Sequence, residues 1–233
     1  MANTHRYGIR YVRSISGAPV PQIFTFPIAT AYAPVTIVGA GTSVNLNIGD
    51  PVRLFEDGTI GLVQAGQDTS GANADSDDYA FGVIVGFPRV IVGGYPRPGS
   101  FYTTGTTYTG GIGSDSAPLV SVIPVEGNIF EIDSLAAPSP ATKSGAMTYV
   151  GMTATLTYTV LTAGNGQPKA NPLLDLSTAA AGGANQLQFQ IVGLGKAGDT
   201  MDFAAANVTF QVMFGAKQLQ AAPDAAIFGA NLE

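Results

Sequence analysis

Side chains that could carry out chemistry are few in this chain of 233 residues. It has no cysteine and a single histidine, His5, close to the N-terminus. A thiolate nucleophile, a disulfide and a Cys/His zinc site are therefore excluded, and a histidine-based triad would have to recruit His5. The nucleophile-elbow, zincin and kinase signatures are also missing from the sequence. We expect a protein that is not an enzyme and that uses no cofactor.

Two groups of carboxylates are candidates for chemical sites. Glu126 and Glu131 could pair for glycoside hydrolysis, but five residues along apparent strands place them on opposite faces or across a turn. Asp75, Asp77 and Asp78 could bind a hard cation such as calcium, although the glycine and the closing glutamate of an EF-hand are both missing. A solvated acidic loop is the simpler interpretation, so no metal site is predicted.

One glycine-rich motif resembles a nucleotide-binding loop. Residues 193–198 read GLGKAG and follow a predicted strand, as the dinucleotide-binding pattern requires. That pattern also needs a helix whose N-terminus receives the pyrophosphate, whereas another strand follows here and too little chain remains for a doubly wound sheet. We interpret the motif as a glycine-rich connection between strands.

The N-terminus is basic and aromatic, which makes it a candidate for binding a partner. Arg6, Arg10 and Arg13 are three of the ten basic residues, and no acidic residue lies among them. Tyr7 and Tyr11 alternate with these arginines, so the segment could dock on an acidic or apolar surface. An edge strand whose side chains are alternately exposed to solvent explains the same pattern. Both interpretations stay open.

Two further sets of apolar residues could meet a partner. Tyr95, Phe101 and Tyr102 lie in a segment rich in Gly, Thr and Pro, where they would contact a protein or glycan or else pack across a hairpin. Ile227 and Phe228 in the C-terminal tail would reduce solubility if they were exposed. We therefore expect a homo-oligomer, most simply a trimer, that buries them; folding back onto the last strand is the alternative.

Composition and periodicity predict that an all-β fold positions these residues. Only 11% of the residues are charged, and 30 glycines and 15 prolines interrupt the chain, while a hydrophobic share of 45% is enough for a core. Apolar and polar residues alternate over Met152–Leu161, and Asp57-Gly58 is a strong hairpin signal. Other strands are predicted within Pro51–Phe55, Leu119–Val125, Asn128–Ile132, Met147–Val150, Gln186–Val192 and Val208–Phe214, with two short strands in Tyr79–Val92 and a loop over Asn171–Gly183.

The predicted fold is all-β, with one or two small β-barrel or β-sandwich modules and an extended N-terminal arm. The arm covers residues 1–34, the modules cover 35–136 and 137–220, and a tail covers 221–233. A Pro-Ser-Pro sequence near the second boundary is the candidate hinge. We expect no membrane contact, because no apolar stretch is long enough, and no nucleic-acid partner, because the net charge is −6.

Several short motifs resemble the structural cement, or capsid decoration, proteins of tailed bacteriophages. They are Gly49–Leu54, Ala80–Phe87 and Leu187–Leu194, the last followed by Val208–Val212. The resemblance implies an all-β module that binds the major capsid protein on the outer surface of an icosahedral virion, often as a trimer, and stabilises the shell. A head fibre or a tail component that binds the host surface is the alternative. A secreted carbohydrate-binding module is disfavoured by the missing signal peptide and tryptophan.

Overall fold

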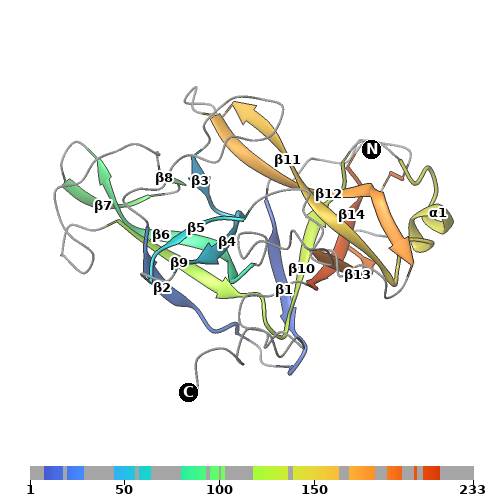
Figure 1. Cartoon of the computed structure of the whole chain (residues 1–233), viewed down its shortest axis with the longest axis horizontal. Helices are drawn as coiled ribbons and strands as arrows, with labels where there is room; N and C mark the ends of the chain where they lie inside the picture. The colour runs from blue at the N-terminus through green and yellow to red at the C-terminus, as the bar shows by residue number, and fades with distance from the viewer. Residues whose placement is uncertain are drawn as a thin grey trace, which may run out of the picture.

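The computed structural model of the chain is all-β, as the sequence predicts, with one short helix among the residues described. It describes residues 8–17, 20–28, 45–55, 58–63, 80–92, 95–99, 101–102, 118–135, 139–162, 168–181, 188–195, 202–203 and 207–215. Two sheets contain most of the strands and lie next to each other, one on each side of the molecule (Figure 1).

The first sheet has six antiparallel strands in the order β1-β10-β14-β13-β11-β12. Its strands are β1 (Arg10–Ser14), β10 (Asn128–Asp133), β14 (Thr209–Phe214), β13 (Phe189–Leu194), β11 (Met152–Thr162) and β12 (Pro168–Ala181). A parallel bridge from Ser134 to Leu174 joins the end of β10 to β12, so the sheet rolls up into a small barrel. β1 occupies the same edge of β10 nearer its start, opposite Asn128–Glu131.

The second sheet has the order β2-β9-β6-β4-β5, with β7 added beside β6. Its strands are β2 (Phe24–Pro27), β9 (Leu119–Pro124), β6 (Gly82–Val92), β4 (Pro51–Leu54), β5 (Ile60–Leu62) and β7 (Tyr95–Gly99). A parallel bridge between Ile28 and Ile60 links its two ends, so this sheet also curls into a barrel. A separate ribbon pairs β3 (Leu46–Asn47) with β8 (Phe101–Tyr102).

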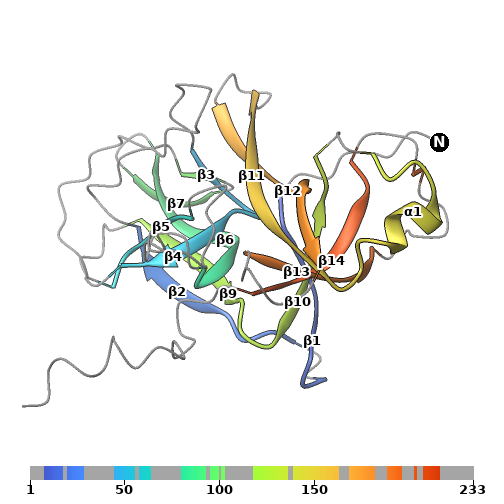
Figure 2. The same ribbon diagram turned by 45° about the vertical axis from the view of Figure 1, so that its right-hand side comes forward.

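The two barrels share one hydrophobic core, and the views in Figures 1 and 2 agree that they lie against each other. The buried hydroxyl of Tyr158 on β11 donates a hydrogen bond of 2.8 Å to the carbonyl of Val63, just after β5. Strand membership also crosses the predicted boundary at residue 137, because β10 precedes it and yet pairs with β14. The chain passes from the first barrel to the second between β1 and β2, and back again between β9 and β10.

Three local predictions are wrong. Met147–Val150 is not a strand, because the helix α1 (Lys143–Met147) ends at Met147. The helix begins where the Thr142 side chain accepts a hydrogen bond from the backbone amide of Gly145. The predicted loop over Asn171–Gly183 is mostly β12. The predicted pair of short strands in Tyr79–Val92 is the single strand β6, which bends at register shifts instead of breaking.

Candidate docking surface

The structure places the candidate partner-binding residues in different surroundings. Arg10, Tyr11 and Arg13 lie on β1. Tyr95 begins β7, and Phe101 and Tyr102 form β8, where the backbone but not these side chains is described. Arg6, Tyr7, Ile227, Phe228, His5 and the acidic loop Asp75–Asp78 lie outside the described residues.

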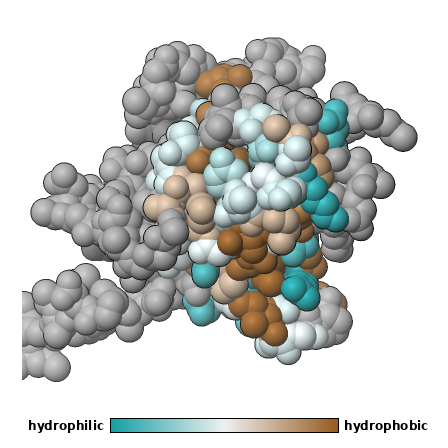
Figure 3. All heavy atoms as spheres, turned by 90° about the vertical axis from the view of Figure 1, so that its right-hand side faces the viewer, coloured by the Kyte–Doolittle hydropathy of each residue, from teal (hydrophilic) through white to brown (hydrophobic). Residues whose placement is uncertain are grey.

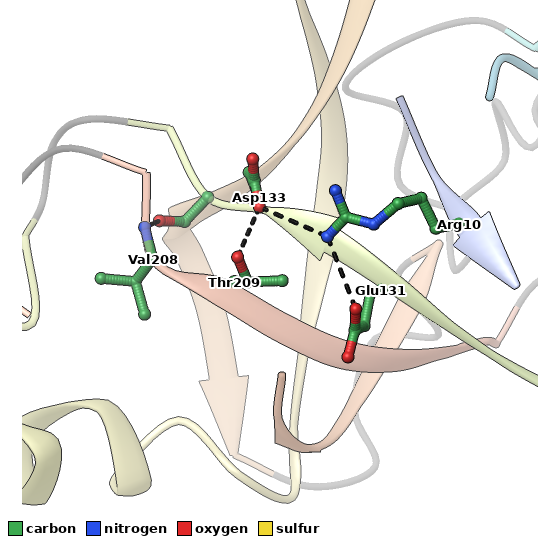
Figure 4. A network of polar contacts seen from close by, with 6 residues as sticks. Arg10, Glu131, Asp133, Val208 and Thr209 are labelled. Atoms are coloured by element: carbon green, nitrogen blue, oxygen red, sulfur yellow. Dashed lines mark hydrogen bonds and ion pairs between the residues drawn. The ribbon is translucent and has the colours of Figure 1, made fainter. Parts of the chain in front are cut away.

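Arg10 binds carboxylates of its own chain. β1 and β10 pair so that Arg10 is opposite Glu131. The Arg10 guanidinium Nη2 lies 3.5 Å from Glu131 Oε2 and 4.0 Å from Asp133 Oδ1, and both carboxylates are buried (Figure 4). Thr209 donates a hydrogen bond of 2.6 Å to the same Asp133 oxygen. Arg10 therefore fastens β1 to the first barrel and is a poor candidate for contacting a separate partner.

The next two candidates of the N-terminal arm have opposite exposures. The half-buried ring of Tyr11 meets Phe130 edge to face, with ring centroids 6.2 Å apart, so it packs on the core of the first barrel. A bulge between Tyr11 and Arg13 shifts the register by one residue. Arg13 is exposed and is available to a partner.

An exposed apolar surface begins directly after β1. We call it the β1–β2 surface and define it by Ile15, Val20, Ile23 and Phe24, whose exposed fractions are 54%, 68%, 53% and 38%. They are four of the six large hydrophobic side chains that are exposed in the described part of the chain. Figure 3 shows that apolar side chains also reach the surface on the face of the molecule that carries α1. Because all four fall within ten consecutive positions of the chain, we take this segment as the candidate docking surface.

The backbone on each side of the β1–β2 surface is held in place. The amide of Ile15 and the hydroxyl of Ser14 both donate to the carbonyl of Gly127, at 2.8 and 3.2 Å. At the other end, Phe26 on β2 packs edge to face on Phe81 with centroids 5.1 Å apart. The segment that carries the β1–β2 surface is therefore attached to the rest of the protein at both ends.

The β1–β2 surface was not among the sequence-based candidates. The signal was present, because the chain has no charged residue from Ser14 to Gly49. Its four prolines between residues 19 and 34 favoured connecting structure instead. The edge strand that proline permits is β2, at one end of the second sheet.

The motifs behind the family resemblance occupy structural positions. In the motif Gly49–Leu54, the Asp50 carboxylate is buried and accepts a hydrogen bond of 2.8 Å from the amide of Asn47, which closes the turn before β4. In the motif Ala80–Phe87, a side chain at Gly82 would collide with Val122 and Ile123 of β9. These residues therefore shape the second barrel.

The remaining chemical candidates are not brought together into a site, although Glu126 precedes Gly127, whose carbonyl accepts the hydrogen bond from the Ile15 amide. Glu126 is exposed in the turn between β9 and β10, whereas Glu131 is buried beside Arg10. Gly193 belongs to β13, and the amide of Gly195 donates to Thr209 at 2.9 Å. Among the described residues, no three His, Cys, Asp or Glu side chains are grouped as metal ligands.

Two further observations bear on possible partners: the hydropathy of the helices and the comparison with known proteins. Within the described ranges, no helix has both the length and the hydropathy that a bilayer crossing requires. No protein-family model, no curated protein and no solved structure matches this chain.

Proposed function

We propose that this protein is a non-enzymatic virion structural protein, which binds the outer surface of an icosahedral phage capsid and stabilises the shell. The resemblance of its strand motifs to cement proteins supports this proposal, and so does the all-β fold in which those motifs shape the barrels. The observation that carries it is the β1–β2 surface, since an uncharged, exposed apolar segment that is attached at both ends is suited to permanent contact with another protein.

In this proposal, the β1–β2 surface packs on the major capsid protein. Fully burying an aliphatic or aromatic side chain is worth about 1.5–3 kcal/mol, and these four side chains are already partly covered, so one subunit alone would bind weakly. A homotrimer would bring several such surfaces to the shell at a high effective concentration. Arg13, exposed at the end of β1, would add an ionic contact at the rim.

The test uses phage capsids that lack this protein. Purified full-length chain is added back, the capsids are sedimented, and the bound protein is measured. Ile23→Asp places a charge in the β1–β2 surface and should reduce occupancy at least tenfold, because the charge would be desolvated at the contact. Met147→Asp is the matched control, because Met147 is similarly exposed at 49% but lies on α1.

The outcomes separate the two functional classes. Binding of the unchanged chain and of Met147→Asp, with loss for Ile23→Asp, supports the proposal. If the unchanged chain does not bind capsids, the proposal fails, and binding to intact host cells would then support the receptor-binding alternative. If all three proteins bind capsids equally, the β1–β2 surface is not the attachment site.

A further inference from the structure

We propose that β1 is exchanged between copies of this chain, so that Arg10–Ser14 of one copy pairs with β10 of a second copy. In the isolated oligomer the second copy covers part of the β1–β2 surface, and the rest stays open to the capsid protein. This inference concerns self-association only and does not depend on capsid binding. It rests on how β1 is attached, on the segment that comes after β1 in the chain and on the side chains that the single copy leaves exposed.

β1 is attached along β10 and, just before its first residue, by the hydrogen bond from the Ile9 amide to the Gly49 carbonyl, and exchange moves both attachments to the second copy. The pairing of β1 runs along β10, from Arg10 opposite Glu131 to Ser14 opposite Asn128. The Arg10 ion pair and the Tyr11–Phe130 ring contact also end on β10. A β1 strand supplied by a second copy can make each of these contacts with the same geometry. The bridge from Ser134 to Leu174 joins β10 to β12 without β1, so the barrel does not need its own copy of the strand to close.

The chain after β1 is suited to act as the hinge of such an exchange. Nine residues, 15–23, separate Ser14 from Phe24, and when extended they reach about 30 Å. The link begins with a turn, in which the amide of Gly17 donates a hydrogen bond of 3.3 Å to the carbonyl of Ser14, and exchange requires this turn to open. The sequence of the link also has prolines at positions 19 and 21, and proline is accommodated in both turns and extended segments. Exchange of an identical element across such a link is a low-cost route to an oligomer.

The exposed side chains favour the exchanged form. Ile15, Val20 and Ile23 all belong to this link and are more than half exposed in the single copy. In a reciprocal exchange of β1 the two links approach each other, so part of their apolar surface is covered and removed from water. No charge opposes this approach, because the chain has none from Ser14 to Gly49. All native pairing is kept while apolar surface is removed from water, so association is favoured.

Exchange of β1 can be tested with introduced cysteine pairs, because the chain has no native cysteine. Ser14 and Asn128 are Cα partners across β1 and β10, and the spacing of antiparallel partners suits a disulfide. The double variant Ser14→Cys/Asn128→Cys is oxidised in dilute solution, denatured and analysed without reductant. Exchange predicts that more than half of the chain runs as a covalent dimer or trimer: reciprocal exchange gives two chains and exchange around a ring gives three.

A control cysteine pair within one barrel and a second cysteine pair between β1 and β10 complete the disulfide test. Gln190→Cys/Met213→Cys links partners on β13 and β14, both of which stay in one copy, so it should give an internal disulfide and a single-chain band. Arg13→Cys/Ile129→Cys bridges β1 and β10 at a neighbouring position and should repeat the covalent oligomer. The inference is overturned if both β1–β10 pairs form internal disulfides and migrate as single chains, as the control does.

Discussion

Gly8 and Gly49 cross so closely that a β-carbon added to either residue would lie under 3 Å from the backbone of the other, at 2.8 Å from the Gly49 Cα and 2.7 Å from the Gly8 Cα. Both have a positive φ, +80° and +93°. The amide of Ile9 donates to the Gly49 carbonyl at 2.8 Å, which fixes the crossing. The start of β1 is thereby fastened to the turn that precedes β4, so the N-terminal segment contacts both barrels.

Replacement of Gly49 by alanine should therefore destabilise the protein more than strain alone explains. The left-handed backbone costs an alanine about 1–2 kcal/mol, and the collision with Gly8 adds about 1–3 kcal/mol. We expect the free energy of unfolding in urea to fall by about 2–5 kcal/mol. Gly58→Ala is the control, because Gly58 has a φ of +79° but no atom within 4 Å of the added carbon. Equal losses for the two variants would show that the close crossing contributes nothing.

Arg10 and Arg13 should differ in their effect on stability although both belong to β1. Arg10→Gln leaves the buried Glu131 and Asp133 without the guanidinium, and we expect a loss of about 1–3 kcal/mol, between the values for exposed and fully buried pairs. Arg13→Gln should change stability by no more than about 0.5 kcal/mol, because Arg13 is exposed. Urea unfolding of both variants measures this, and a loss for Arg13→Gln as large as that for Arg10→Gln would contradict the assignment.

The fold could be predicted where one signal was strong along the chain. Strict alternation over Met152–Leu161 predicts β11, and the turn signal before Ile60 predicts the hairpin of β4 and β5; both are confirmed. β12 was missed because Leu173 and Leu174 are adjacent and both buried, which hides the alternation. α1 was missed because five residues are too short to show a helical period.

The candidate site was only partly predictable, because its decisive contacts are distant in sequence. Arg10 was expected to contact a separate partner, but it binds Glu131 of its own chain, which is 121 residues away, so the sequence could not show that the charge is used internally. The tyrosine in the same segment was expected either at a partner or on an edge strand, and Tyr11 packs on Phe130. Exposure of Ile15 and Ile23 depends on what the rest of the fold leaves uncovered, which local patterns do not encode.

The hydrogen bond from Tyr158 to Val63 joins the two barrels and should make their unfolding cooperative. Tyr158→Phe keeps the ring but removes the donor to a buried carbonyl 2.8 Å away, and we expect a loss of about 1–2 kcal/mol. Urea unfolding followed by circular dichroism and by tyrosine fluorescence measures the size of the loss and whether one transition remains. An unchanged midpoint would show that this hydrogen bond does not stabilise the contact between the barrels.

Gln188 supplies a hydrogen bond that the sheet lacks where β11 and β13 diverge. In the described part of the chain these strands pair through Thr153 and Ala154. Two residues further on, the amide of Leu156 donates a hydrogen bond of 2.8 Å to Gln188 Oε1. Since both residues are buried, Gln188→Ala would leave an amide without its acceptor, and we expect a loss of about 1–3 kcal/mol. Gln190→Ala, at an exposed position two residues along the chain, should cost no more than about 0.5 kcal/mol. Hydrogen exchange of the Leu156 amide gives the site-specific measurement: its protection should fall in the Gln188 variant and stay unchanged in the Gln190 variant. Equal protection in both would mean that this side chain does not hold the two strands together.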